Sequence, residues 1–274
     1  VFHCKRKIVG PLIENCYIEW ICDEAINLSG GYYYVTGVSS DTQFQLDNTS
    51  NFAVGDTLLF VDMKNGVELG ETYVASKSGN NITTSSAITG VVAGEPRAST
   101  TTFVMNLSKS NSGFIIRNNT FGGQRRYAML IRCQNGLIEN NTGEKLGGGI
   151  ILTNEIVSFF EGPFPRNITI QNNSFTNIRR WPIWLKASTY SSVPGQLVQD
   201  IRLYDNIFGP SDAGEAATTF DHVSNVELMG NELVDHASAG GIAMRNSRNI
   251  AVKCNNTYNG TPVSSLDNGI ELIS

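Results

Sequence analysis

The sequence has little charge, few prolines and no long apolar run. Charged residues make up only 16% of its 274 residues, against about 25% in an average globular domain, which excludes a chain built from long, charge-laced surface helices. No apolar stretch approaches the roughly 18 residues that a membrane-spanning helix needs. Hydrophobic residues still reach 41%, so the chain can bury a large core and intrinsic disorder is excluded.

Basic clusters and paired cysteines are also missing from the sequence. The 20 Lys and Arg residues are scattered and the formal net charge is −5, so we expect no binding of nucleic acid and no anionic membrane surface as partner. The five cysteines are an odd number without CxxC spacing, which supports neither a zinc site nor a disulfide framework. We expect buried free thiols, no metal and no cofactor.

Both ends of the sequence read as the middle of a fold. The chain begins at Val1 without Met, no apolar segment of a signal peptide follows the basic residues at 5–7, and the last residues, 269–274, resemble a strand. We therefore expect an internal stretch of a longer protein.

Glycine and asparagine are abundant instead. The chain has 27 Gly and 28 Asn but only 8 Pro, a balance typical of short strands joined by tight turns. Many of the asparagines belong to a repeat in which an apolar-polar alternation ends at Asn, with a weaker copy at 11–17. The six clear copies are 113–121, 135–142, 167–175, 200–208, 225–233 and 249–257.

The aligned asparagines give the period of this repeat. The steps between them are 22, 32, 33, 25 and 24 residues, for Asn119, Asn141, Asn173, Asn206, Asn231 and Asn255. Alternation with period two indicates a strand with one buried face, and a second short strand follows most of the turns. Stacked coils of this length predict an all-β fold, a right-handed parallel β-helix. Asn suits the left-handed backbone of a sharp turn, and its amide can bond to the next coil.

Residues 31–103 interrupt the repeat. About five short alternating stretches, separated by Gly, Asn, Asp and Ser, predict antiparallel strands in a small barrel-like domain. We therefore divide the chain into the first coils at 1–30, an inserted β domain at 31–103 and the continued β-helix at 104–274. The insertion has two interpretations, a lid or spacer for folding and a wall over a substrate groove.

Acidic residues in unusual places mark candidate sites on this solenoid, which has no enclosed pocket. Asp23 and Glu24 stand directly before an apolar strand, although such a pair is often only a solvated turn. Glu155 begins a loop at 155–166 that lengthens its coil, after three glycines at 147–149 that let a ligand approach the backbone.

A third candidate site is aromatic. If Ile183 and Leu185 point into the core, Trp184 and Lys186 point outward because neighbouring strand residues face opposite sides. An exposed Trp is a natural platform for a sugar ring, and packing of the ring under a loop is an equally weighted alternative.

The stretch from His3 to Tyr34 resembles glycoside hydrolase family 110. It carries IENCY at 13–17 and CDEAIN at 22–27, which are similar to the "IENC.F" and "DDAINVHG.Y" motifs of these bacterial exo-α-galactosidases. FAVGD at 52–56 is similar to the "F.PGD" turn of the family, and the likeness continues to about residue 180.

The resemblance implies a β-helix with an inserted barrel and an extracellular or periplasmic location. It also implies an enzyme that removes a terminal α-linked galactose from an oligosaccharide or polysaccharide with inversion of configuration. Two features depart from the family, because its Asp-Asp pair is Asp-Glu here and its His before the glycine is Ser29. The resemblance implies a catalytic role for Asp23 and Glu24, and we place Glu155, from the long loop, as the third candidate catalytic acid around the bond, with acid and base not assigned among the three. Inverting hydrolysis needs one acid and one base about 6.5 to 9.5 Å apart. The candidate sugar contacts are Asn27, Arg126, Trp184 and Lys186.

Two other functions stay open on the sequence. A polysaccharide lyase of similar fold would need a Lys or Arg base, such as Lys186 or Arg126, beside a calcium site. A glycan-binding β-helix without activity would retain the sugar contacts while the Asp-Glu pair marks lost catalysis.

Overall fold

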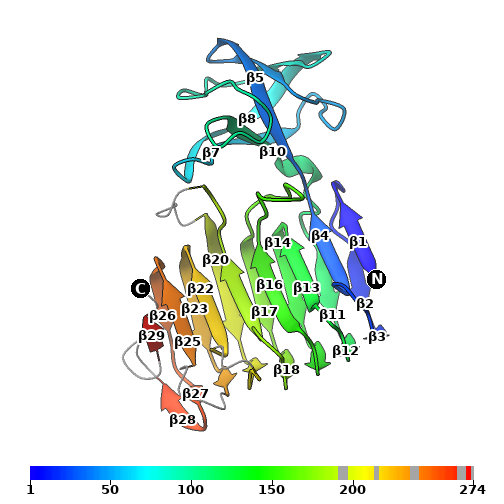
Figure 1. Ribbon diagram of the computed structural model, residues 1–274, viewed down its shortest axis with the longest axis vertical. Coiled ribbons are helices and arrows are strands. Elements are labelled where there is room, and N and C mark those ends of the chain that lie inside the picture. Colours follow the sequence, from blue (N-terminus) through cyan, green and yellow to red (C-terminus); the bar gives the residue numbers. More distant parts are fainter. Residues whose placement is uncertain (191–196, 213–215, 235–240, 264–269, 273–274) are drawn as a thin grey trace.

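The computed structural model describes residues 1–190, 197–212, 216–234, 241–263 and 270–272. Three parallel sheets form the sides of the β-helix, and a closed barrel stands beyond one edge of them, above the middle coils in this view (Figure 1). The prediction of an all-β parallel β-helix carrying a small antiparallel barrel is confirmed. No helix in the described part of the chain is long and apolar enough to cross a membrane.

Successive coils contribute strands to the three sheets. The first sheet consists of β1 (Phe2–Lys5), β4 (Ile26–Ser29), β13 (Tyr127–Arg132), β16 (Gly148–Thr153), β19 (Ile183–Lys186), β22 (Thr218–Asp221), β25 (Ile242–Arg245) and β29 (Ile270–Leu272). The second consists of β2 (Leu12–Glu14), β11 (Ile115–Arg117), β14 (Gln134–Glu139), β17 (Arg166–Gln171), β20 (Val198–Tyr204), β23 (Val223–Met229) and β26 (Arg248–Val252). The third consists of β3 (Tyr17–Glu19), β12 (Thr120–Gly122), β15 (Thr142–Glu144), β18 (Ser174–Thr176), β21 (Ile207–Phe208), β24 (Glu232–Leu233) and β27 (Asn256–Tyr258), with β28 (Thr261–Val263) antiparallel at its end.

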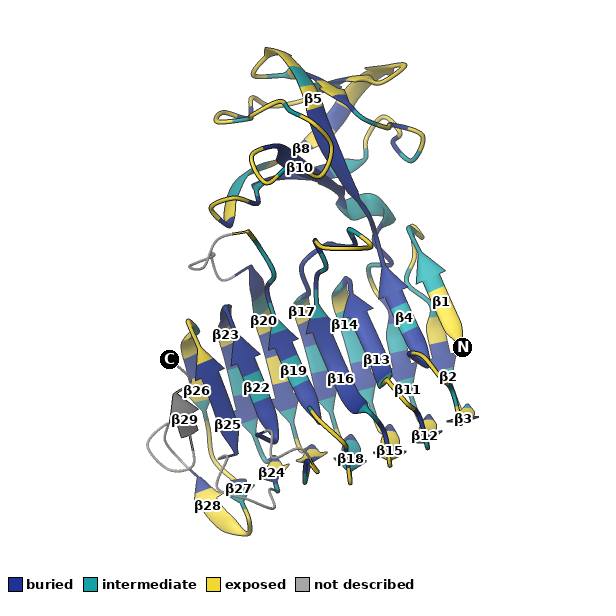
Figure 2. Cartoon of the chain, in the orientation of Figure 1, coloured by how far each residue is buried: buried dark blue, intermediate teal, exposed yellow. Residues whose placement is uncertain are grey.

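The alternation in sequence fixes which face of each sheet is buried. Apolar residues at every second position form one continuous core between the three sheets, and exposed residues gather at the turns (Figure 2). In the first sheet Ile183 and Leu185 are fully buried, while Trp184 and Lys186 face outward. This alternation decides which side chains the first sheet presents on its outer face.

Asparagines form a continuous ladder inside the β-helix. From Asn119 onward, each amide Nδ2 donates to the Oδ1 of the next, at 2.9 to 3.0 Å, through Asn141, Asn173, Asn206, Asn231 and Asn256. The ladder residue of the last coil is therefore Asn256, so our alignment on Asn255 is one residue off. The bend and the ladder fall on neighbouring residues, because Asn255 has a φ of 64° while Asn256 is buried.

The barrel closes in the order β10-β5-β6-β9-β8-β7. Its strands are β5 (Tyr32–Ser40), β6 (Gln43–Leu46), β7 (Thr57–Asp62), β8 (Val67–Ser78), β9 (Asn81–Thr84) and β10 (Thr102–Asn106), and a short 3₁₀ helix, η1 (Leu107–Lys109), follows it. It has six strands rather than about five, because the stretch at 102–106 pairs with both β5 and β7 and closes the ring.

One side of the barrel packs against the β-helix. Tyr33 and Val104 belong to the core of the barrel, whereas their neighbours Tyr34 and Phe103 belong to the core of the β-helix. Neighbouring strand residues point to opposite faces, so β5, β7 and β10 are buried on both sides. The ring of Phe160, in the long loop after β16, lies 6.3 Å from that of Tyr34. The barrel therefore packs against this loop as well as against the sheets.

All five cysteines are free thiols. Cys133 is buried as expected, but the expectation is wrong for Cys22 and Cys254, which are exposed because they lie in turns rather than at core positions of a strand. Cys16 takes the ladder position in the first coil, where its backbone N–H donates to Asn119 Oδ1 at 3.0 Å.

Candidate functional site

A groove of about 420 Å³ lies along the outer face of the first sheet, over β1, β4, β13, β16 and β19. One wall is the turn before β4 and the other is the loop after β16. The groove is lined by Val1, His3, Asp23, Glu24, Asn27, Arg126, Tyr127, Leu130, Arg132, Ile151, Thr153, Glu155, Ser158, Phe159, Glu161 and Trp184.

The strand register brings groove residues from distant parts of the chain into one row. His3 pairs with Asn27, Asn27 with Leu130, Leu130 with Ile151, and Ile151 with Trp184. All five occupy outward positions, because their strand neighbours point into the core. The floor of the groove is therefore apolar at its centre, with a polar end at Asn27 and an aromatic end at Trp184.

The acidic pair stands at one wall of the groove. The side chain of Asp23 is 69% exposed and that of Glu24 only 10%. The Arg126 guanidinium bridges them, with Nε 3.6 Å from Asp23 and Nη1 3.5 Å from Glu24. Burial raises the pKa of Glu24, and its interaction as a donor with the Asp23 carboxylate and the charge of Asp23 raise it further. The same interaction lowers the pKa of Asp23, so Glu24 is the member of the pair that keeps its proton to higher pH.

Glu155 organises the opposite loop. Its Oε1 accepts the N–H groups of Val157 and Ser158 at 2.6 and 2.8 Å, and its Oε2 those of Phe159 and Phe160 at 2.6 and 2.8 Å. Burial acts to raise the pKa of Glu155, but these four amides outweigh it and lower the pKa. The carboxylate is thus fully engaged in holding the loop.

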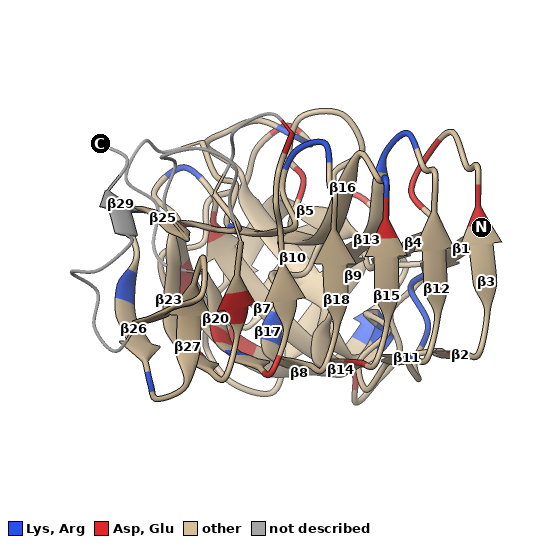
Figure 3. Cartoon of the chain, turned by 90° about the horizontal axis from the view of Figure 1, so that it is seen from below, with Lys and Arg blue, Asp and Glu red and all other residues tan. Residues whose placement is uncertain are grey.

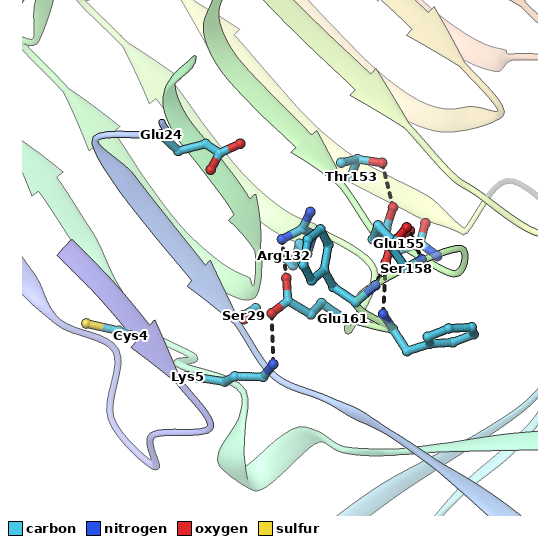
Figure 4. A network of polar contacts seen from close by, with 12 residues as sticks. Cys4, Lys5, Glu24, Ser29, Arg132, Thr153, Glu155, Ser158 and Glu161 are labelled. Carbon is cyan, nitrogen blue, oxygen red and sulfur yellow. Dashed lines mark hydrogen bonds and ion pairs between the residues drawn. The ribbon is translucent and has the colours of Figure 1, made fainter. Parts of the chain in front are cut away.

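A buried ion pair ties the same loop to the sheet. Glu161 accepts from Arg132 at 2.5 Å and from Lys5 at 2.8 Å, and Glu161 and Arg132 are each about 5% exposed. Figure 4 shows Glu161 between these two cations, with Glu24 standing apart from the network. A backbone hydrogen bond also holds the end of this loop against the chain that follows β4, because Gly30 N donates to Gly162 O at 2.5 Å.

The aromatic end of the groove is a stack. The rings of Trp181 and Trp184 lie 4.3 Å apart with an interplanar angle of 26°. Lys186 Nζ lies 5.1 Å from the centre of the Trp184 ring, and Arg180 covers Trp181 at 4.9 Å. Trp184 itself is half-buried, and the part of its side chain that stays accessible lines the groove.

The structure brings six of the seven predicted site residues into this one groove. Lys186 does not line the groove. It is the next outward-facing residue after Trp184 on β19. Sequence reasoning missed the network of Lys5, Arg132 and Glu161. No local signal marks it, because the three residues come from two strands and a loop that only the strand register brings together.

The barrel is not a wall of the groove. Of the described residues, those that line the groove come from 1–27 and from 126–184. The barrel contacts the groove through the loop after β16: Tyr34 packs against the ring of Phe160, and Arg97 covers that ring at 4.6 Å. The insertion therefore supports the loop that forms the groove.

Within the described residues, no three His, Cys, Asp or Glu side chains converge in a group that could hold a metal ion. The carboxylates of the groove are instead engaged with arginine, lysine, backbone amides or each other.

Neither a protein-family model nor a curated protein matches the sequence. Among solved structures, the chain is similar to the Gp54 tailspike of Acinetobacter baumannii bacteriophage AP22, solved in complex with A. baumannii capsular saccharide, at 12% identity and a TM-score of 0.34 over 93% of this chain and 52% of that one. It is similar to the tailspike protein gp49 from Pseudomonas phage LKA1 at 11% identity and a TM-score of 0.30 over 90% and 50%. The chain spans about half the length of each tailspike.

Proposed function

We propose that this protein binds a glycan in the groove and hydrolyses a glycosidic bond there, with Glu24 as the general acid. One observation carries the proposal: a largely buried carboxyl group with a raised pKa lies beside an exposed one with a lowered pKa in the same groove. Two acidic groups whose surroundings separate their pKa values are the usual basis of acid and base roles.

Glu24 gives its proton to the leaving oxygen, and Asp23 activates the attacking water. The two carboxyl groups belong to neighbouring residues and interact with each other, whereas inversion needs about 6.5 to 9.5 Å between them. The exposed side chain of Asp23 can rotate away when a sugar oxygen replaces it as the partner of Glu24. Glu155 is left out of this mechanism because four backbone amides occupy its oxygens.

The groove also offers contacts for a sugar. Trp184 lines the groove between Trp181 and Lys186, and its half-buried indole offers apolar contact area to a sugar ring. Asn27 Oδ1 is buried without a hydrogen-bond partner in the protein, so it can accept a bond from a sugar hydroxyl. Arg126 reaches the same end of the groove.

The first substrate to test comes from the sequence resemblance, which supports a terminal α-linked galactose and a location outside the cytoplasm. We expect release of free sugar from p-nitrophenyl α-galactoside or from an α-1,3-galactosyl oligosaccharide within a wider glycoside panel. Glu24→Gln and Asp23→Asn should each lower turnover by at least about 100-fold. The matched control Glu232→Gln removes an exposed carboxylate on the third sheet and should leave turnover unchanged.

Binding without cleavage is the second candidate. It is favoured by the opposite wall, where the carboxylates of Glu155 and Glu161 are both engaged and no third acid is available to the reaction. If sugar binds in the groove with no turnover of any substrate, and Trp184→Ala abolishes binding, this second function replaces the first.

A further inference from the structure

Two pairs of arginines flank one hollow beside the groove. Arg125 and Arg126 lie in the turn from β12 to β13, and Arg179 and Arg180 in the turn from β18 to β19. A hollow of about 330 Å³ between these turns is lined by Arg125, Arg126, Tyr127, Gly147, Arg179 and Arg180. In Figure 3 both arginine turns, in blue, lie along the same edge of the β-helix as the acidic turn before β4.

The floor of the hollow is the intervening turn, which carries no side chain at Gly147. A Cβ on Gly147 would lie 2.0 Å from the Arg125 carbonyl oxygen, so only glycine fits. Gly147 N donates to Gln124 O at 2.8 Å, and Arg179 N donates to Leu146 O at 2.7 Å. These bonds hold the glycine turn against both neighbours and leave the space between the arginine pairs open.

The charge of the hollow is not balanced from within. None of the described residues that line it is acidic, and all four arginines are exposed. Arg125 Nε donates to the Cys22 carbonyl at 2.8 Å, which is an uncharged acceptor. Among the described residues, Arg126 is the one of the four that forms ion pairs, at 3.5 and 3.6 Å from Glu24 and Asp23, and the charge of Arg125 also acts on Asp23. Four guanidinium groups so placed repel one another and keep donors free for an anion.

We propose that this hollow is a subsite for the anionic group of an acidic glycan, a carboxylate, sulfate or phosphate carried on a sugar. The hollow shares Arg126 and Tyr127 with the groove, so a saccharide bound beside Glu24 can extend its charged substituent over Gly147. Rigid guanidinium forks match the oxygen geometry of all three anions. The inference rests on the proposed function, because it names the substrate class of that same groove.

The test compares acidic polysaccharides with their neutral forms. Binding is measured by calorimetry at low and at moderate salt. Three pairs of polymers are compared: a uronic-acid polymer and its carboxyl-reduced form, a sulfated polymer and its desulfated form, and a phosphate-bearing polymer and its dephosphorylated form. Wild type should bind the acidic member of at least one pair about tenfold more tightly. Arg179→Gln/Arg180→Gln should abolish that preference. The charge-matched control Arg202→Gln/Arg248→Gln, on the second sheet, should retain it.

Which pair shows the preference identifies the anion. Equal binding of both members in every pair, no binding of any polymer, or a preference that survives in Arg179→Gln/Arg180→Gln would each overturn the inference. Glu24→Gln separates it from the proposed function. An acidic preference together with turnover that persists in Glu24→Gln rejects the catalytic role and retains the subsite. If turnover depends on Glu24 but acidic polymers are not preferred, the catalytic role is retained and the anionic subsite is rejected.

Discussion

The carboxyl groups of Asp23 and Glu24 interact with each other, and the interaction moves their pKa values in opposite directions. Burial raises the pKa of Glu24 and its exposed neighbour adds to the effect, while the interaction with Glu24 lowers the pKa of Asp23. Glu24, the buried member of the pair that lies against the groove, therefore keeps its proton to higher pH than Asp23.

This pair predicts an alkaline limit to activity. Glu24 must be protonated to act, so kcat/KM should fall as pH rises through its pKa, which lies above the ordinary value of 4.5. Asp23→Asn removes the negative charge that helps to raise this pKa, so the residual activity of the variant should fall at lower pH. A pH profile of kcat/KM for both proteins measures the shift, and an unmoved alkaline limb would reject the coupling.

The same pKa shift provides a folding control. A raised pKa means that Glu24 contributes stability below its unfolded pKa and loses it as pH rises through its folded pKa. Glu24→Gln mimics the protonated form, so the variant should be at least as stable as wild type at neutral pH. Urea denaturation at pH 7 checks this, and a large loss of stability would show that the activity change reflects unfolding.

Glu155 carries a prediction of the opposite sign. Its lowered pKa means that it contributes stability above its ordinary, unfolded pKa of 4.5, and that this contribution is lost as pH falls through the folded pKa. Glu155→Ala leaves four loop amides without their acceptor and should cost about 2 kcal/mol. Limited proteolysis should then cut within 156–160 faster than in wild type at neutral pH. Glu232→Ala should change neither quantity, and intact loop protection in Glu155→Ala would contradict the prediction.

The asparagine ladder predicts different outcomes at two neighbouring positions. Asn173 is buried and bonds to the coils on both sides, so Asn173→Gly should cost about 3 kcal/mol of the free energy of unfolding. Asn172 has a φ of 54°, which glycine adopts without strain, so Asn172→Gly should change stability by less than about 0.5 kcal/mol. Denaturant unfolding of both variants tests this. Equal costs would mean that the two roles are not divided in this way.

The buried pair of Arg132 and Glu161 predicts a non-additive result. Glu161→Gln leaves the Arg132 charge buried beside a neutral partner, which should cost about 3 to 5 kcal/mol. Adding Arg132→Met removes that charge, so the double variant should be more stable than Glu161→Gln alone. A double-mutant cycle measured by urea unfolding decides it. Additive losses would show that the two charges do not depend on each other.

Local patterns were sufficient for most of the fold. Period-two alternation predicted which face of each strand is buried, and it correctly placed Ile183 and Leu185 in the core. The repeat predicted the stacking of coils, because strands of equal pattern pair in register. The ladder residue of the last coil needed the structure, since Asn255 and Asn256 are both asparagine and only the hydrogen bonds separate them.

The sequence by itself determined the architecture and nominated the acidic pair, because both depend on residues that are neighbours in the chain or recur at a fixed period. Only the tertiary structure decided what surrounds them. Parallel stacking places equivalent positions of successive coils side by side, whatever their separation in sequence, so it brought Arg126 next to Glu24 across the inserted barrel and gathered four arginines that look scattered in the sequence. It also engaged Glu155 with its own loop, because the path of a long loop follows from what it packs against rather than from its composition.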